Sequence, residues 1–230
     1  MAGFARKLVR QIRIDGVAGV LAKVPLWLRG HCEARLDRRL GIATVGQVEV
    51  ADSALLEPGH DHLANAVFYA PLQFAKFRRL IRAARPFDPE QYTFIDYGAG
   101  KGRALVLASG LGFRRVVGIE LFDSLCRHAR RNLDAVAARD PAAARIELLC
   151  MDAALYRPPA GDLFCYFYNP FDDVVMRQVL AHLEAADASA ARRILIAYSN
   201  PVHAGVFDSA GFLRLHHSSD GLRIYRNRRH

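Results

Sequence analysis

The sequence predicts an α/β protein built on a three-layer, doubly wound, mostly parallel sheet of seven strands. From Tyr92 onward, short β-branched and aromatic runs alternate with segments of helical periodicity, which is typical of a parallel sheet with crossover helices. The first run leads through a glycine-rich turn into a helix. The chain ends in two strand-like segments around an Asp-Gly turn, which predict a C-terminal antiparallel hairpin.

The individual elements follow from the same periodicities. Strands are expected at 92–95, 114–121, 145–150, 162–168, 193–199, 212–217 and 222–225. Helices are expected at 103–109, 123–138 and 174–186, and Asp123 has the residue type of an N-cap.

Residues 1–85 are expected to form an N-terminal helical extension that acts as a lid, and residues 86–230 to form the main domain. The segment 4–28 has the pattern of an amphipathic helix. Contact with a membrane surface is one interpretation of it, but a helix packed on the domain or a loosely ordered arm is favoured. Nothing in the segment reaches transmembrane length.

Three further segments of the extension have recognisable patterns. Residues 32–40 are helical in pattern, and Gly41 follows as a C-cap. Residues 43–50 alternate enough for a short strand or an extended segment. Residues 75–84 form a basic amphipathic helix that Pro86 ends.

Composition sets limits on function. The chain has 230 residues, 52% apolar and 24% charged, which is ordinary for a globular protein with a sizeable core. The net charge of +9 permits an acidic partner such as nucleic acid or anionic lipid, although arginines spread along the chain carry most of it.

The four cysteines are expected to be free thiols. They form no CxxC pair and have no zinc-ligand spacing, and three of them lie in or beside apolar runs, where cysteine behaves as a small hydrophobe. This pattern indicates a reducing, cytoplasmic compartment. No metal site is predicted, since His60 and His62 are best explained as polar residues of a loop.

The glycine-rich turn after the first strand is the most informative stretch. It has an acid followed by glycines at every second position, Asp96, Gly98, Gly100 and Gly102. Glycine permits positive φ and leaves no Cβ between backbone and ligand, and the turn is expected to place free N–H groups beside that ligand. Arg103 occupies the third position of Gly-x-Gly-x-x-Gly, which excludes the dinucleotide pattern. A phosphate gains nothing from an aspartate here, whereas the ammonium group of an amino-acid tail does.

This spacing resembles motif I of the class I, seven-strand S-adenosylmethionine (SAM) methyltransferases, and the resemblance extends from Tyr92 to the C-terminus. It implies that SAM is the cofactor and that the turn residues Asp96, Gly98, Ala99, Gly100 and Gly102 bind it. Plain dinucleotide-binding domains do not end in the terminal hairpin, whereas class I methyltransferases do.

The next two strand ends extend the resemblance. Glu120 and Leu121 follow the second strand, where an acid accepts hydrogen bonds from ribose hydroxyls. A solvated strand end is the alternative for Glu120. By the same resemblance, Asp152 binds the adenine amino group and Ala153 faces a ring nitrogen. The alternative for Asp152 is an N-cap or turn residue.

The fourth strand end carries the candidate catalytic residues, Tyr168, Asn169, Pro170 and Phe171. They resemble the Asn-Pro-Pro-Tyr motif of amino-group methyltransferases, with Phe171 at the position of the second proline. The resemblance implies that Asn169 lies against SAM and holds the N–H groups of an amine while the lone pair of that amine faces the sulfonium. Tyr168 and Phe171 would then be aromatic walls for a planar base or a cation. A plain Asn-Pro turn is the alternative.

Tyr69 lies upstream, in a segment similar to the Tyr-x-Pro segment of seven-strand protein-lysine methyltransferases. By that similarity it covers the methionine part of SAM, with a buried hydrophobic tyrosine as the alternative. Arg103 is expected to pair with an acid or with the carboxylate of SAM, and Lys101 to be exposed to solvent.

Together these residues predict a SAM-dependent methyltransferase that methylates an amine nitrogen by in-line displacement. A protein amine such as lysine is the favoured acceptor. A nucleic-acid base is the first alternative because of the basic charge, and a catalytically silent SAM-binding scaffold is the second.

Overall fold

The computed structural model describes residues 30–45 and 72–228. The chain divides into two compact units, Met1–Val45 and Gly46–His230. The predicted domain boundary at residue 85 stays a prediction.

The first unit contains one described helix, over residues 30–40. Gly41 follows it with a φ of 76°, so the predicted glycine C-cap is confirmed. The Asp37 carboxylate of this helix accepts a hydrogen bond of 2.7 Å from the backbone N–H of Thr44. Residues 43–45 are not in a strand, and the rest of the expected segment 43–50 lies outside the described residues.

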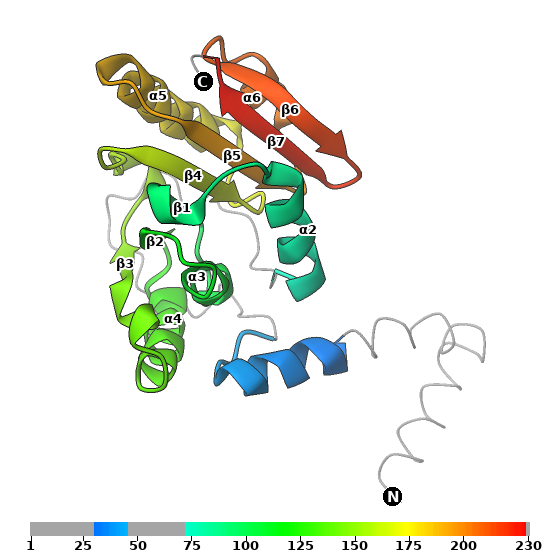
Figure 1. Ribbon diagram of the computed structural model, residues 1–230, viewed down its shortest axis with the longest axis vertical. Helices are drawn as coiled ribbons and strands as arrows, with labels where there is room; N and C mark the ends of the chain where they lie inside the picture. The colour runs from blue at the N-terminus through cyan, green and yellow to red at the C-terminus, as the bar shows by residue number, and fades with distance from the viewer. Residues whose placement is uncertain (1–29, 46–71, 229–230) are drawn as a thin grey trace, which may run out of the picture. The chain divides into compact units, whose positions relative to one another are not determined.

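The second unit is organised around a seven-stranded sheet with the order β3-β2-β1-β4-β5-β7-β6 (Figure 1). Its strands are β1 Tyr92–Tyr97, β2 Arg115–Glu120, β3 Ile146–Cys150, β4 Asp162–Phe167, β5 Ile194–Ser199, β6 Leu213–Ser219 and β7 Leu222–Asn227. The first five strands are parallel, whereas β7 pairs antiparallel with both β5 and β6. The predicted fold class is therefore confirmed.

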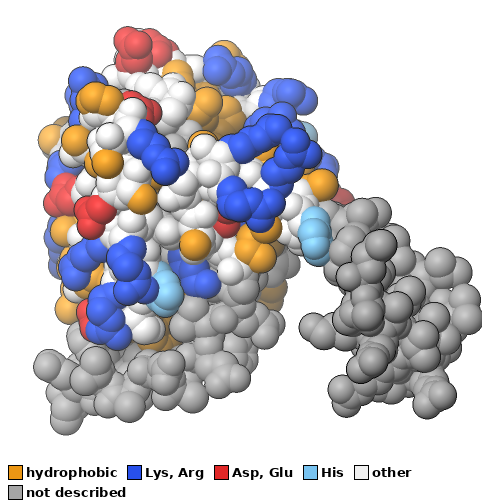
Figure 2. All heavy atoms as spheres, turned by 90° about the horizontal axis from the view of Figure 1, so that it is seen from below, with side chains coloured by type: hydrophobic (Ala, Val, Ile, Leu, Met, Phe, Trp, Pro, Cys, Tyr) orange, Lys and Arg blue, Asp and Glu red, His pale blue; other side chains and the backbone are white. Residues whose placement is uncertain are grey.

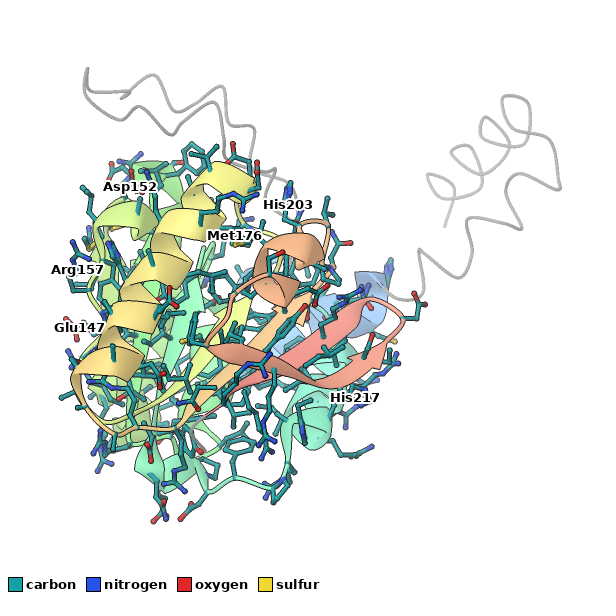
Figure 3. All side chains as sticks on the ribbon, turned by 90° about the horizontal axis from the view of Figure 1, so that it is seen from above. Glu147, Asp152, Arg157, Met176, His203 and His217 are labelled. Atoms are coloured by element: carbon teal, nitrogen blue, oxygen red, sulfur yellow. A yellow bond between two sulfur atoms is a disulfide. The ribbon has the colours of Figure 1, made fainter. Side chains whose placement is uncertain are left out.

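Helices cover both faces of the sheet, which gives the three layers seen in Figures 1 and 3. One face carries α2 Phe74–Ala84, α3 Arg103–Ser109 and α4 Asp123–Ala137, and the other carries α5 Asp173–Ser189 and α6 Ala204–Asp208. Three short 3-10 helices lie in the connections, η3 Pro89–Gln91, η4 Pro141–Arg145 and η5 Ala153–Leu155.

Two helix N-termini differ from the sequence prediction by one position. Asp123 is the first residue of α4, not its N-cap, because the preceding Phe122 occupies the cap position. Helix α5 starts one residue before the predicted Val174, because the Asp172 carboxylate caps it by accepting from the N–H of Val174 and of Val175, both at 3.1 Å. Both cap positions immediately precede an acidic residue, so the aspartates alone did not identify the cap.

The two faces of the parallel strands form two cores because side chains alternate along each strand. On the α5 side, aliphatic and aromatic residues pack in one buried cluster that includes Ile95, Val117 and Leu163. On the α2 side the core is aromatic, and Phe94 lies 5.6 Å from Phe164 between ring centroids. Burial on both faces explains why β1 and β4 are largely apolar in sequence, without a strict alternation of polar and apolar residues.

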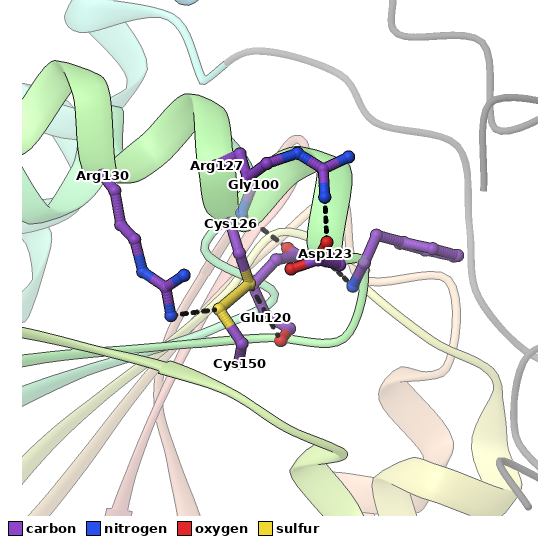
Figure 4. Close-up of a disulfide and its surroundings, with 8 residues drawn as sticks. Gly100, Glu120, Asp123, Cys126, Arg127, Arg130 and Cys150 are labelled. Atoms are coloured by element: carbon purple, nitrogen blue, oxygen red, sulfur yellow. Dashed lines mark hydrogen bonds and ion pairs between the residues drawn. A yellow bond between two sulfur atoms is a disulfide. The ribbon is translucent and has the colours of Figure 1, made fainter. Parts of the chain in front are cut away.

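The cysteines differ from the sequence prediction. Cys126 of α4 and Cys150 at the end of β3 form a disulfide across 24 residues of sequence (Figure 4), so the expectation of free thiols was wrong for this pair. The crossover between β2 and β3 brings the two residues together, and their spacing in sequence carries no sign of it. Cys165 is a buried free thiol and Cys32 an exposed one.

Replacing the disulfide by Cys126→Ala with Cys150→Ala is expected to lower the free energy of unfolding by about 2–4 kcal/mol, because the unfolded chain regains the entropy of the closed loop. Urea unfolding monitored by circular dichroism measures this. A reductant should lower the wild-type midpoint toward that of the double variant and leave the double variant unchanged. A wild-type midpoint that does not respond to reductant would contradict the cross-link. Cys32→Ala is the control and should keep the wild-type response.

Candidate active site

A cavity lies at the carboxyl edge of the parallel strands, where side chains that follow four strands meet. Its polar lining includes Asp96 at the end of β1, Glu120 at the end of β2, Asp152 after β3 and Asn169 after β4. The chain runs from β1 outward to β3 and then returns to β4 on the other side of β1. This reversal of strand order leaves a crevice, which is the usual ligand position in such sheets.

The backbone N–H groups of the glycine-rich turn are bound to β2, although Gly98, Ala99 and Gly100 line the cavity. The N–H groups of Gly98 and Ala99 both donate to the carbonyl oxygen of Ile119 at 2.9 Å. The N–H of Gly100 donates to Glu120 Oε2 at 2.7 Å. The prediction of free backbone N–H groups was therefore wrong for these three residues, because the turn folds back on the neighbouring strand. The glycines permit that path, since Gly98 and Gly100 have φ values of 84° and 55°.

Gly98 also lies in close contact with the fourth strand end. A Cβ at this position would stand 2.4 Å from the Cβ of Pro170. The absent side chain thus lets the turn after β1 and the turn after β4 meet across the crevice. Both residues line the cavity.

Glu120 is oriented by two backbone groups. Its Oε2 accepts from Gly100, and its Oε1 accepts from the N–H of Phe122 at 2.9 Å. Burial raises the pKa of Glu120 above its usual range, and the hydrogen bonds from Phe122 and Gly100 oppose this shift. Each carboxylate oxygen retains acceptor capacity that a ligand hydroxyl can use.

Asp96 is the most unusual charge in the cavity. It is 3% exposed, and within the described part of the chain no hydrogen bond reaches its carboxylate. Burial, and then the negative charge of Glu120, raise its pKa well above the usual range. A buried carboxylate without a donor is costly, so its position is best explained by a ligand that brings a cation or hydrogen-bond donors.

The lining as a whole is acidic. Among the described residues it includes three carboxylates, Asp96, Glu120 and Asp152, and one guanidinium, Arg103. Arg103 is buried, donates to the carbonyl oxygen of Leu72, and lies 4.6 Å from the ring centroid of Phe74. The cavity is thus suited to a ligand of net positive charge.

Asp152 has a local structural role as well as a place in the cavity. Its Oδ1 accepts from the N–H of Ala154 at 2.8 Å and caps η5, so the cap that the sequence left open as an alternative is present. Ala153 also lines the cavity. Figure 3 places Asp152 and His203 toward the same edge of the molecule.

Asn169 is held by a residue that the sequence did not point to. Its Oδ1 accepts from the hydroxyl of Tyr198, at the end of β5, at 2.9 Å. That hydroxyl in turn accepts from the N–H of His203 at 3.2 Å. Asn169 has a φ of 46°, in the left-handed region where Asn is better tolerated than most residues. The sequence shows Tyr198 only as an apolar strand residue, so its role requires the pairing of β5 with β4.

The aromatic residues after β4 line the same cavity. Tyr168 contacts Lys76 in the first turn of α2, and Lys76 Nζ is 3.3 Å from the Tyr168 hydroxyl and 5.6 Å from its ring centroid. Phe171 packs against the buried cluster on the α5 side. Leu121 lines the cavity beside Glu120. The contact of Lys76 with Tyr168 was not predicted from the sequence.

Lys101 is buried, which differs from the sequence prediction. It is 6% exposed, so the expectation of solvent exposure was wrong. Its carbonyl oxygen accepts from Asn132 Nδ2 of α4, and this helix covers the turn.

Three residues that the sequence singled out lie outside the described residues, namely Tyr69, His60 and His62. In the described ranges, no three His, Cys, Asp or Glu side chains are grouped as metal ligands would be. No described helix is both long enough and apolar enough to cross a membrane.

The fold resembles that of one solved structure in particular, the PH0226 protein described below. No protein-family model and no curated protein matches the chain. The PH0226 protein of Pyrococcus horikoshii OT3 is similar in structure with a TM-score of 0.50 and 12% identity, over 67% of this chain and 90% of that one. A ribosomal protein L11 methylase from Lactobacillus delbrueckii subsp. bulgaricus has a TM-score of 0.48 and 13% identity, over 71% and 91%. An RNA methyltransferase from Salinibacter ruber, in complex with S-adenosyl-L-homocysteine, has a TM-score of 0.47 and 18% identity, over 68% and 92%.

Gly98→Ala is expected to destabilise the protein more than Gly112→Ala does. Both glycines have positive φ, 84° and 80°, so each alanine has a strain of roughly 1–2 kcal/mol. Only the Cβ at position 98 meets another residue, and forcing Pro170 away adds about 1–3 kcal/mol. Urea unfolding of the two variants measures the difference. Equal losses of stability would contradict the close contact between the two turns.

Proposed function

We propose that the protein is a SAM-dependent methyltransferase that transfers a methyl group to an amine nitrogen. The observation that carries the proposal is the convergence of Asp96, Glu120, Asp152 and Asn169 on one cavity. The fold alone is compatible with several nucleotide ligands, so the choice of SAM depends on the chemistry of these side chains.

The residues present fit SAM. The carboxylate of Asp96 would bind the ammonium group, and the two oxygens of Glu120 would accept from the ribose hydroxyls. Asp152 would accept from the adenine amino group beside Ala153. An acidic lining also favours a ligand that carries a sulfonium, whereas the phosphates of a dinucleotide would be repelled.

When bound, SAM would supply an electrophilic methyl group, which would pass from its positively charged sulfur to the lone pair of the acceptor nitrogen, with the electrons of the carbon–sulfur bond left on sulfur and a proton of the nitrogen lost to solvent. The protein holds the nucleophile in line with that bond and excludes water, which are effects of proximity and orientation. An acceptor that is an alkylamine must enter deprotonated, and burial lowers its pKa toward neutrality.

Asn169 is the residue proposed to hold the acceptor. Its Oδ1 already accepts from the Tyr198 hydroxyl and retains a second lone pair for an acceptor N–H. Tyr198 therefore acts as a positioning residue that fixes the rotamer of Asn169. Tyr168 and Phe171 would form walls for the acceptor.

SAM binding should depend on the ionised form of Asp96. Because the pKa of Asp96 is raised in the free protein, wild-type affinity for SAM should fall as the pH is lowered through that raised pKa. Asp96→Asn should bind SAM at least 10-fold more weakly at neutral pH and lose this pH dependence. Isothermal titration calorimetry between pH 5 and 8 measures both effects.

Asp96→Asn should also fold well, because it removes a charge that burial disfavours. A raised folded-state pKa means that the stability from protonated Asp96 is present at low pH and lost as the pH rises through that pKa. The exposed Asp123→Asn is the control and should keep wild-type affinity. Undetectable SAM binding by the wild type, or wild-type affinity in Asp96→Asn, would overturn the proposal.

Asn169→Ala and Asn169→Gly should both retain SAM binding and lose at least 100-fold of methyl transfer. Glycine tolerates the φ of 46° and alanine does not, so the pair separates backbone strain from loss of the side chain. Tyr198→Phe should lower turnover less, with little change in SAM affinity. Transfer from tritiated SAM into a cell lysate measures turnover. Wild-type turnover in Asn169→Gly would exclude the acceptor-holding role, and SAM binding without any labelling would favour a silent scaffold.

A further inference from the structure

The outward face of α2 carries a group of cations. Its side chains are Lys76, Arg78, Arg79 and Arg82, and all four are exposed. The opposite face of the helix is buried through Phe77, Leu80, Ile81 and Ala84. No acidic residue lies in α2, and within residues 30–45 and 72–228 none of the four cations forms a salt bridge. Figure 2 shows one group of Lys and Arg side chains on the side of the molecule that bears α2, and others elsewhere on the same face.

Helix stability does not account for this arrangement. Cations are favourable near the C-terminus of a helix and unfavourable near its N-terminus, because of the helix dipole. Arg82 lies in the last turn, but Lys76 lies in the first turn of α2. Like charges three or four residues apart on one helix also repel each other, as Lys76 and Arg79 do and as Arg78 and Arg82 do. The group of cations therefore has a cost that a ligand of opposite charge would remove.

The cationic face is continuous with the cavity. Leu72, two residues before α2, lines the cavity, and Lys76 contacts Tyr168, which lines it too. From Lys76 the face runs along the helix to Arg82, a rise of about 9 Å. Beyond α2, the Arg226 side chain donates to the carbonyl oxygens of Ala84 and Pro86 and adds another positive charge.

The charges inside and outside the cavity select the chemistry of the partner. An anionic chain is attracted to α2 but not to the acidic interior, so its charged backbone stays outside and a neutral group enters. Arginine forks match phosphate oxygens, and Tyr168 and Phe171 offer faces on which a base stacks. A lysine-rich peptide would be repelled by α2. This charge pattern argues against a basic protein tail as the acceptor.

We infer that the outward face of α2 binds the phosphates of single-stranded nucleic acid and so presents an unpaired base to the cavity. The inference rests on the proposed function, because it assigns the acceptor amine to a base amino group. An unpaired base is required because the reacting atom of a stacked base cannot reach a cavity at the sheet edge.

The test is equilibrium binding of a fluorescent, mixed-sequence 20-nucleotide single-stranded RNA, measured by anisotropy at increasing KCl. Logarithmic affinity should fall linearly with logarithmic salt, with a slope near −0.7 for each phosphate neutralised. Arg78→Gln with Arg79→Gln removes two cations and should make the slope less steep by about 1.4 and weaken binding at least 10-fold at low salt. Glutamine is a good helix former, so α2 should persist.

A matched double variant controls for net charge. Arg157→Gln with Arg177→Gln removes two exposed arginines, one in the loop before β4 and one on α5, and should keep the wild-type salt slope. Equal salt slopes for the two double variants would overturn the inference. It would also be overturned if the wild type did not bind RNA at about 50 mM KCl, a low salt concentration at which contacts between cations and phosphates are strong. Preferential binding of polyglutamate over RNA would assign the face to an acidic protein and would also overturn it.

Calorimetry with SAM separates the two proposals. Both double variants should bind SAM as the wild type does, because neither pair lines the cavity. If the wild type does not bind SAM, the proposed function is wrong, but the RNA measurement can still be interpreted. Nuclease digestion that removes tritium from a labelled lysate would support the inference, whereas removal by protease alone would contradict it.

Discussion

The hydrogen bonds between the glycine-rich turn and the end of β2 hold the site together. Ile119 accepts two N–H groups of the turn through its backbone, and Glu120 accepts a third through its side chain. The second oxygen of Glu120 binds Phe122 at the start of the next loop. One carboxylate thus fixes the geometry of two strand ends while remaining available to a ligand. The relative position of Asp96 and Glu120 in the cavity depends on this connection.

The convergence of four strand ends could be predicted because topology determines it. Parallel strands present their carboxyl ends at one edge, so polar residues that follow buried apolar runs must lie near each other. The acid at Asp96 and the glycine spacing were also informative, because each has a physical requirement that few other residues meet. The strands themselves could be predicted because burial on both faces leaves short, largely apolar runs.

Other features depend on contacts between segments that sequence patterns do not connect. The hydrogen bonds between the glycine-rich turn and β2 depend on the register of β1 against β2. The hydrogen bond between Tyr198 and Asn169 depends on the pairing of β5 with β4. The disulfide depends on how α4 lies over the end of β3. Lys101 is buried because α4 covers the turn, and an isolated lysine in a loop gives no sign of that.

The contact between Gly98 and Pro170 has a consequence for how this sequence can diverge. A side chain at position 98 meets the Cβ of position 170, which every residue except glycine possesses. Glycine at position 170 would remove the prolyl ring that stiffens the turn after Asn169. The two positions are therefore expected to change together or not at all among related chains. Covariation between positions 98 and 170 would therefore indicate that a related chain keeps this crevice, even where overall sequence similarity has been lost.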